Sequence, residues 1–337
     1  ANLGQLKQMF PDYVVEGLVI PFGIFRQHMN QKMPGYDGSY WEYLNASFAE
    51  AEQQRNNGSS AEAVNRFTLE KLNRLRTAIM QIELLPDFVE ELESGFKKTF
   101  GNRLGNVPVF LRSDTNMEDL AEFTGAGLNL TKFNVVNRDK IIKGIKEVWA
   151  SPYTERSFKW RQSYLLNPEN VFPSILIIPT VDVEHSGVVI TKGITTNDGR
   201  DVTIAFSRGA GGAVDGQAAE TYLLQHNYDN VLLSPAREQD VRRLPQTGGS
   251  VMNKTTFEQP ILSDKNLNTL RELAYDIHQR FPKSETGSHG PFDIELGFAN
   301  DQPWLFQGRP FVENDNAKTY EYLESISPKL EGEIAVR

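Results

Sequence analysis

The spacing of apolar residues changes partway along this chain of 337 residues, and this change constrains the fold more than any other feature. Up to about residue 165, apolar side chains recur at the three-to-four-residue interval of a helix face. From residue 175 onward, short β-branched runs dominate, which is typical of strands. The chain lacks the regular strand–helix alternation of a Rossmann protein, so the pattern predicts an α+β fold.

The apolar pattern also predicts where the helices and strands lie. Helices are expected at residues 62–82, 88–98, 141–149, 156–165 and 267–281. Strands are expected at residues 175–178, 188–191, 202–206, 292–298 and 304–309. Pro86 is expected to interrupt the helical pattern, and residues 300–303 to supply the turn between the last two strands. Residues 317–337 are expected to form a helix and a polar tail.

Composition excludes several classes of chemistry. Because the chain has no cysteine, disulfides, thiolate zinc sites, iron–sulfur clusters and cysteine nucleophiles are excluded. The net charge of −9, from 44 acidic and 35 basic residues, is a poor match to a nucleic-acid or anionic-membrane binder. No apolar run approaches the roughly 18 residues of a membrane span. We therefore expect a cytoplasmic protein with neither a nucleic-acid nor a membrane partner.

The last two predicted strands form a hairpin that gathers polar side chains. Since residues two apart in a strand share a face, the alternation groups Asp293 with Glu295 and, on the partner strand, Leu305, Gln307 and Arg309. A turn centred on Asp301 pairs Glu295 with Gln307 and Asp293 with Arg309. Carboxylate and amide oxygens suit Mg²⁺, and a guanidinium suits phosphate. From spacing alone, a solvated hairpin with two cross-strand charge pairs is an equally good interpretation.

Two other segments have the composition of anion-binding loops. An apolar strand at 109–111 leads directly into Arg112 and the polar residues that follow it. The loop 209–216 carries four glycines in eight residues, whose backbone N–H groups could wrap phosphates. The alternatives are a strand end with a structural arginine and a simple tight loop. No P-loop motif is present, and the five histidines show no metal-binding spacing, so we expect them to be structural or exposed.

Taken in order, these motifs resemble the N-terminal ATP-grasp domain of the pyruvate phosphate dikinase and phosphoenolpyruvate synthase family, which also includes the glucan and phosphoglucan water dikinases. The resemblance rests on the segments 1–6, 112–120, 186–191 and 293–310, and the loop 209–216 looks like the family's glycine loop. It implies two α+β lobes, with antiparallel sheets and flanking helices, that close over ATP and Mg²⁺. It further implies an N-terminal lobe at 1–178 with a helical insertion at about 40–100, a C-terminal lobe at 179–314 carrying the metal hairpin, and a helix, tail or linker at 315–337.

The resemblance also implies roles for individual residues. Arg112 and Arg309 look like the family's catalytic, phosphate-binding arginines, and Arg156 looks like a further ATP-binding arginine. Glu295 and Gln307 look like its metal ligands. The remaining nucleotide contacts that it implies are Asp293 (also beside the metal), the adenine-facing Ile178, Thr180 and Val181, and the loop glycines Gly209, Gly211 and Gly212.

The sequence departs from the family pattern in two places. The family's phosphate-binding lysine lies just before the Ala-Asn-Leu segment, and this chain begins at Ala1, so we expect that lysine to be missing through truncation. Family members pass phosphate to a histidine on a separate swivelling domain. Residues 247–249 form a Thr-Gly-Gly sequence without the histidine that follows it in the family.

We therefore expect a Mg·ATP-binding, phosphate-donating module of a dikinase-like phosphotransferase that is incomplete for turnover on its own. The histidine partner would be supplied by missing sequence in cis or by another protein in trans. The final acceptor stays open among pyruvate, a glucan and other molecules, and so does the oligomeric state. A non-catalytic ATP-binding sensor within a larger protein is the main alternative, because it would keep the same binding residues.

Overall fold

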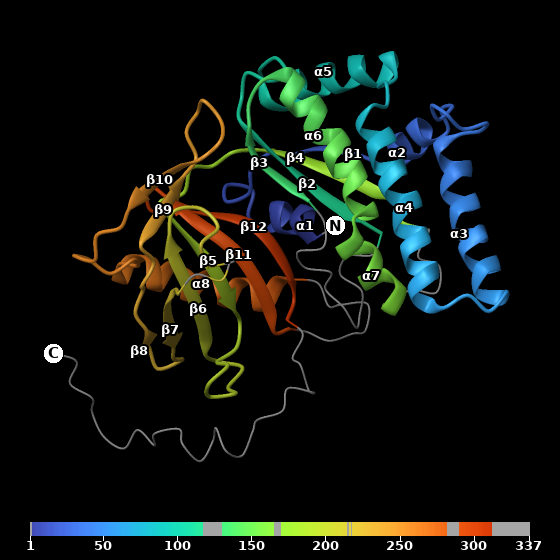
Figure 1. Cartoon of the computed structure of the whole chain (residues 1–337). Helices are drawn as coiled ribbons and strands as arrows, with labels where there is room; N and C mark the ends of the chain where they lie inside the picture. Colours follow the sequence, from blue (N-terminus) through green and yellow to red (C-terminus); the bar gives the residue numbers. More distant parts are fainter. Residues whose placement is uncertain are drawn as a thin grey trace.

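The computed structural model describes residues 2–116, 130–164, 170–213, 216, 218–281 and 290–311. The chain forms two lobes, each built on an antiparallel sheet with helices packed against it (Figure 1). This arrangement confirms the predicted α+β class. The helix and tail predicted for residues 315–337 lie outside the described residues.

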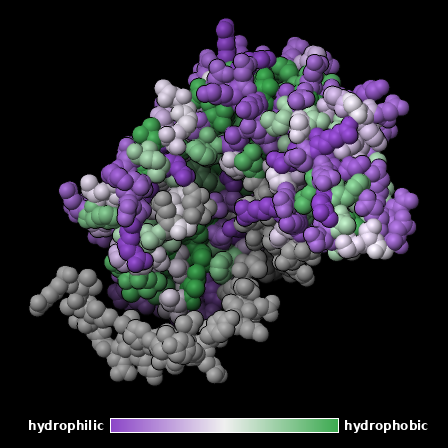
Figure 2. Space-filling model, in the orientation of Figure 1, coloured by the Kyte–Doolittle hydropathy of each residue, from purple (hydrophilic) through white to green (hydrophobic). Residues whose placement is uncertain are grey.

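The N-terminal lobe is a four-stranded sheet covered by helices. Its strand order is β1-β4-β2-β3, with β1 (Leu18–Ile20), β2 (Val109–Thr115), β3 (Thr131–Val135) and β4 (Pro173–Pro179). The helices of this lobe are α2 (Phe22–Met29), α3 (Tyr40–Asn56), α4 (Ala61–Met80), α5 (Pro86–Phe100), α6 (Arg138–Ala150) and α7 (Glu155–Tyr164). Their apolar faces enclose one buried cluster that includes Phe25, Phe96 and Trp149. The outward surface of the helices is mostly hydrophilic on the face drawn in Figure 2.

The helix ends follow local sequence signals. Ser39 caps α3, and its side chain and that of Glu42 satisfy each other's backbone N–H groups in a capping box. Pro86 is the first residue of α5, so it begins a helix as well as interrupting the preceding one. Proline fits this position because it has no N–H group, and the first N–H groups of a helix have no partner within the helix. The same helix ends at Gly101, whose φ of 68° is a conformation that glycine adopts without strain.

The C-terminal lobe is a six-stranded sheet backed by α8 (Asp264–Arg280). Its strand order is β12-β11-β5-β6-β7-β8, with β5 (His185–Ile190), β6 (Val202–Arg208), β7 (Glu220–Leu224), β8 (Asn230–Ser234), β11 (Phe292–Ala299) and β12 (Gln302–Pro310). Two further strands, β9 (Asp240–Arg243) and β10 (Val251–Lys254), form a separate antiparallel ribbon. No helix among the described residues has both the length and the apolar character needed to cross a membrane.

The first helix packs away from the lobe that follows it in sequence. Helix α1 (Asn2–Met9) lies against β12, and Leu6, Phe10 and Val14 belong to the buried cluster of the C-terminal lobe. The sequence-based division placed all of residues 1–178 in the N-terminal lobe, so the packing of this segment differs from it. The physical reason is that Leu6 fills the space over Gly308, where an added Cβ would lie 3.0 Å from a Leu6 methyl group.

The β11–β12 hairpin has the predicted pairing but a different turn. Glu295 pairs with Gln307 and Asp293 with Arg309, as expected. Asn300 and Asp301 have φ values of 52° and 62°, so the turn has two central residues and is not centred on Asp301. A β-bulge between Glu295 and Leu296 restores the predicted register.

The bulge also reverses one predicted orientation. The prediction that Leu305 shares a face with Gln307 is wrong, because the bulge inserts an additional residue between them on one strand. Leu305 pairs instead with Leu296, and both side chains lie in the apolar core.

Candidate functional site

Arg112 joins the two lobes. In β2, Val109 and Leu111 are fully buried under the helices, so the alternating side chains of Phe110 and Arg112 face away from them. The guanidinium of Arg112 donates to the backbone oxygen of Phe306 and to Oε1 of Gln307, both at 2.6 Å. The guanidinium thus reaches from the N-terminal sheet to the β11–β12 hairpin.

A second guanidinium–carboxylate pair lies on the same hairpin. Arg309 donates from Nε and Nη2 to one oxygen of Asp293, at 3.0 and 2.9 Å. Both side chains are about 15% exposed, so this pair is much less screened than an ordinary surface ion pair. The other carboxylate oxygen of Asp293 is buried without a hydrogen-bond partner among the described residues. A buried oxygen with a free lone pair suits a cation or a donor group of a ligand.

Glu295 is the acidic group with the most unusual environment in this region. Burial raises the pKa of its carboxyl above the ordinary 4.5, the nearby charges of Arg112 and Arg309 oppose that rise, and Asp293 adds to it. No hydrogen bond to the Glu295 carboxylate is formed by the residues that the structure describes. Its oxygens therefore remain available for a cation, whose positive charge would offset the free-energy cost of burying the ionised carboxylate.

The two lobes enclose a cavity of about 600 Å³ beside these residues. Its walls include Phe110, Arg112 and Ile178 from the N-terminal sheet, and Ser186, Gly211 and Glu295 from the C-terminal lobe. The lining is mainly apolar and carries Arg112, Arg242 and Glu295 as charged groups. A concave, largely apolar site with a few convergent polar groups is the usual form of a small-molecule site.

The predicted adenine segment reaches this cavity in part. Ile178 and Val181 line it, as does Pro179 between them. The backbone N–H of Thr180 donates to the carbonyl of Pro108 at 2.8 Å, so that donor is already used inside the protein.

The glycine loop 209–216 lines the cavity at Ala210 and Gly211. Gly209 forms a bridge with Arg242, and the N–H of Gly211 donates to the hydroxyl of Ser186 at 2.9 Å. Gly211 lines the cavity, whereas Gly212 is buried. Val214 and Asp215 of this loop lie outside the described residues.

Replacing Gly209 with alanine should destabilise the protein by about 2 kcal/mol or more. Its φ is +74°, and an added Cβ would lie 2.3 Å from the carbonyl oxygen of Arg242. Gly58 is the matched control, because it has a φ of +84° but nothing within 4 Å of the added Cβ. Urea denaturation of Gly209→Ala and Gly58→Ala measures both costs. Equal losses in the two variants would contradict the close approach at Gly209.

Arg156 does not join the other predicted site residues. It is exposed on α7 and lines a different cavity, with Arg76, Ser151 and Thr154. Residues 117–120 of the segment 112–120, on which the family resemblance partly rests, lie outside the described residues. The structure therefore brings together Arg112, the hairpin residues, part of the glycine loop and part of the adenine segment.

Sequence reasoning missed the part of the site formed by the β9–β10 ribbon. Arg242 and Leu244 line the cavity, and the guanidinium of Arg242 lies 5.7 Å from the ring centre of Phe133 on β3. The short polar sequence of the ribbon gave no clear strand pattern. The aromatic residues Phe110 and Phe133 could have been placed on the cavity side only by assigning the strand faces of β2 and β3.

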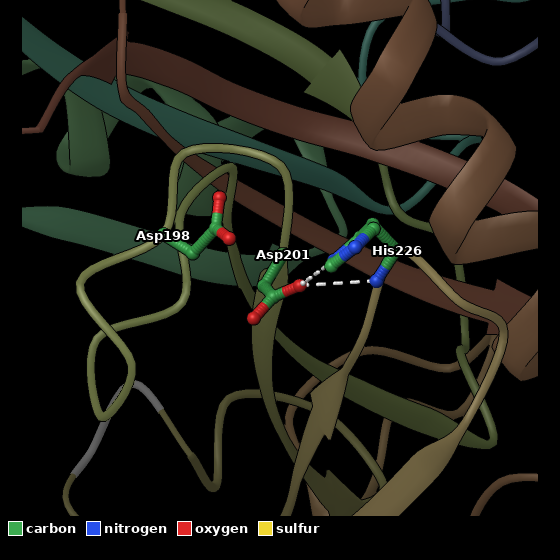
Figure 3. Close-up of side chains that lie close together, drawn as sticks. All are labelled: Asp198, Asp201 and His226. Atoms are coloured by element: carbon green, nitrogen blue, oxygen red, sulfur yellow. Dashed lines mark hydrogen bonds and ion pairs between the residues drawn. The ribbon is translucent and has the colours of Figure 1, made fainter.

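A cluster of two aspartates and a histidine lies elsewhere in the C-terminal lobe (Figure 3). Asp201 accepts hydrogen bonds from the backbone N–H and the ring Nδ1 of His226, both at 3.0 Å. Asp198 forms an ion pair with Arg200, which holds the pKa of that carboxyl far below its usual range. Because Asp201 comes directly before β6 and Gly209 directly after it, this cluster is at the opposite end of the strand from the cavity. Asp201 and His226 are bonded to each other and Asp198 to Arg200, so these groups hold together the loops at that end of the sheet.

His28 confirms the expectation of a structural histidine. Its ring is fully buried, with Nδ1 bonded to the Ile24 carbonyl at 2.7 Å and Nε2 accepting from the Leu85 N–H at 3.1 Å. Burial lowers the pKa of this imidazole, so it stays neutral near pH 7. A neutral ring with both nitrogens occupied has no free atom for chemistry.

The chain is similar in sequence to a family of known proteins over most of its length. Residues 37–329 match the family described as pyruvate phosphate dikinase, AMP/ATP-binding domain. The chain is 26% identical over 273 residues to the phosphoenolpyruvate synthase of Pyrococcus furiosus, covering 76% of this chain and 32% of that protein. It is 28% identical over 234 residues to a rifampicin phosphotransferase of Streptomyces sp, covering 68% of this chain and 26% of that protein.

The chain thus spans about a third of the length of the curated relatives that it matches. Among solved structures, the D-alanine–D-alanine ligase of Helicobacter pylori is similar at 11% identity, with 65% of this chain and 46% of that chain covered. The TM-score of this match is 0.28. The family match extends over most of the chain and includes both lobes and the hairpin. The chain therefore belongs to the pyruvate phosphate dikinase AMP/ATP-binding domain family.

Proposed function

We propose that the cavity between the lobes binds Mg·ATP and that this chain is the phosphate-donor module of a dikinase-like phosphotransferase. The observation that carries the proposal is the convergence of Arg112, Glu295 and Gln307 beside one interlobe cavity, although Arg112 is almost 200 residues away in sequence. An ordinary solvated hairpin would need no guanidinium from another lobe. Membership of a family described by AMP and ATP binding supports the same ligand.

The donor atoms of the hairpin fit a magnesium ion. Among the described residues, none forms a hydrogen bond to the Glu295 carboxylate or to one buried oxygen of Asp293, and Gln307 offers an amide oxygen that now accepts from Arg112. Hard oxygen donors of this kind are the ligands that Mg²⁺ prefers. When bound, the ion would neutralise charge on the phosphate oxygens.

The two arginines would hold the phosphate chain. Phosphoryl transfer depends mainly on positioning and on neutralising charge over the phosphate oxygens. Arg112 and Arg309 present the planar donor fork that matches phosphate oxygens. In the structure Arg112 donates instead to Phe306 and Gln307, so phosphate oxygens would replace these protein acceptors on binding.

The histidine that accepts the group would come from outside this module. None of the described residues that line the cavity is a histidine, and His28 and His226 are committed to structural contacts. We propose that a phosphoryl or pyrophosphoryl group passes from ATP to an imidazole nitrogen of a separate domain. ADP or AMP then leaves, and the imidazole loses its N–H proton.

The full-length protein tests this proposal. Incubation with Mg·ATP should yield AMP or ADP and an acid-labile phosphohistidine, detected by mass spectrometry. ATP binding without either product would show a non-catalytic nucleotide sensor. Failure to bind ATP at all would overturn the nucleotide-binding assignment.

A further inference from the structure

The β9–β10 ribbon belongs to the C-terminal lobe but is tied to the N-terminal sheet by one buried side chain, Asn134. We propose that Asn134 is a positioning residue that latches this ribbon over the cavity and thereby retains the nucleotide. The part of this inference that concerns nucleotide retention rests on the proposed function. The latch itself rests on contacts within the protein alone.

Asn134 makes three hydrogen bonds to one turn of the ribbon. Its side-chain Nδ2 donates to the carbonyls of Pro245 and Gly249, at 2.8 and 2.7 Å. The N–H of Gly249 donates back to the Asn134 carbonyl at 2.9 Å. Asn134 is only 1% exposed, so water does not compete for these groups. Hydrogen bonds that are buried in this way fix the position of the turn.

The backbone on both sides is shaped for this contact. Asn134 has a φ of +50°, a left-handed conformation that asparagine tolerates better than most residues. Gly248 and Gly249 have φ values of +88° and +72°. A Cβ on Gly248 would lie 3.2 Å from the Asn134 carbonyl oxygen and 3.1 Å from a methyl group of Val136. The turn therefore sits directly on β3, and a side chain at Gly248 would disturb that contact.

The ribbon that Asn134 holds forms part of the cavity wall. Arg242 and Leu244, which precede the latched turn, line the cavity, and Arg242 lies over the ring of Phe133. Directly before the latched turn, the ribbon is also held by the Arg243–Asp182 ion pair at 2.9 Å and by a hydrogen bond from the Leu244 N–H to Asp182 at 2.8 Å. Asp182 and Asn134 thus hold neighbouring residues of the same part of the cavity wall.

A two-stranded ribbon is marginally stable by itself, so its position depends on such contacts. Every residue of β10 is exposed, and the ribbon has no sheet neighbour among the described strands. Without the Asn134 side chain, the turn would separate from β3 and the cavity would open along that edge. A nucleotide enclosed by the ribbon would then leave faster.

Two substitutions of Asn134 separate backbone conformation from hydrogen bonding. Asn134→Gly keeps the left-handed conformation without strain and removes both Nδ2 bonds. Asn134→Asp keeps the size and places carboxylate oxygens against two carbonyls. Asn137→Gly is the matched control, since Asn137 lies three residues later, also has a positive φ of 83°, and caps α6 instead of contacting the ribbon.

We expect Asn134→Gly and Asn134→Asp to speed the dissociation of a fluorescent ATP analogue about tenfold, and Asn137→Gly to leave it unchanged. Limited trypsin digestion gives a second measurement that needs no nucleotide. Cleavage after Arg242, Arg243 or Lys254, identified by mass spectrometry, should become faster in both Asn134 variants. A purely structural role would lower the free energy of unfolding without changing the dissociation rate of the folded protein.

Ribbon cleavage and nucleotide dissociation at parental rates in Asn134→Gly would overturn the inference. Faster ribbon cleavage with parental nucleotide dissociation would also overturn it, because the ribbon would then move without affecting retention. If the parent protein binds no ATP, the proposed function fails and nucleotide retention fails with it. The trypsin rates still decide in that case whether Asn134 is a latch.

Discussion

Replacing Arg112 with alanine should weaken ATP binding about 100-fold. The guanidinium of Arg112 donates hydrogen bonds to Phe306 and Gln307 in the unliganded protein. We propose that it donates them to phosphate oxygens in the complex with ATP. A hydrogen bond to a charged group contributes about 1.5–3 kcal/mol, so the loss of one or two of them accounts for the effect. Calorimetric titration with Mg·ATP measures it directly.

Two further variants make this result specific. Arg112→Lys should recover only part of the affinity, because an ammonium lacks the planar fork of a guanidinium. Arg138→Ala is the control in the same lobe, since Arg138 forms an exposed ion pair with Glu93 and does not line the cavity. Circular dichroism verifies that each variant is folded. An Arg112→Ala protein that binds ATP within twofold of the parent would contradict the assignment.

Replacing Glu295 with glutamine should have opposite effects on binding and on stability. The substitution removes the carboxylate that we assign to Mg²⁺, so affinity for ATP in the presence of Mg²⁺ should fall about tenfold or more. Affinity for ATP without Mg²⁺ should change little. At neutral pH the unliganded variant should be more stable than the parent, because the buried carboxylate no longer has to be ionised.

The raised pKa of Glu295 also predicts how the stability difference between Glu295→Gln and the parent changes with pH. Burial raises the pKa of Glu295 in the folded protein above 4.5, so the folded state binds its proton more tightly than the unfolded state does. The resulting stability is fully present below the unfolded-state pKa and is lost as pH rises through the folded-state pKa. The stability advantage of Glu295→Gln over the parent should therefore grow across that interval.

Urea denaturation at several pH values checks this prediction. Glu93→Gln is the matched control, because the Glu93 side chain is 45% exposed and lies outside the cavity. A constant difference between Glu295→Gln and the parent across the whole pH range would contradict the raised pKa. Unchanged Mg²⁺ dependence of ATP binding would contradict the metal assignment.

The β11–β12 hairpin was predicted in part from the sequence. Strand alternation predicted the hairpin and the pairing of Glu295 with Gln307, but the turn assumed for that pairing was wrong by half a residue. The pairing is nevertheless correct, because the bulge between Glu295 and Leu296 compensates for the two-residue turn. The bulge was not predictable from the alternation of apolar and polar residues.

Contacts between distant segments were beyond sequence reasoning without the family resemblance. Alternation alone placed Arg112 at a strand end but could not say that its guanidinium meets Gln307 on the other lobe. Asn134 gave no signal at all, since a single asparagine in a short strand has many structural uses. Its importance comes from a turn more than 100 residues later in the chain.

The packing of α1 illustrates the same limit on a larger scale. The resemblance to the family implied a single N-terminal lobe at residues 1–178, which placed this segment with the strands that follow it. Leu6 instead packs over Gly308 in the C-terminal lobe. The segment between α1 and β1 crosses from one lobe to the other, with the Tyr13 carbonyl accepting from the N–H of Leu305 at 2.8 Å.

Calorimetric titration of this chain with ATP, in the presence and absence of Mg²⁺, tests the central claim most directly. We expect saturable binding of one ATP per chain, weakened when Mg²⁺ is removed and weakened about 100-fold in Arg112→Ala. Parallel crosslinking with an azido-ATP analogue should label the residues that line the interlobe cavity. Absence of binding at millimolar ATP with Mg²⁺, in a chain that circular dichroism shows to be folded, would contradict the account.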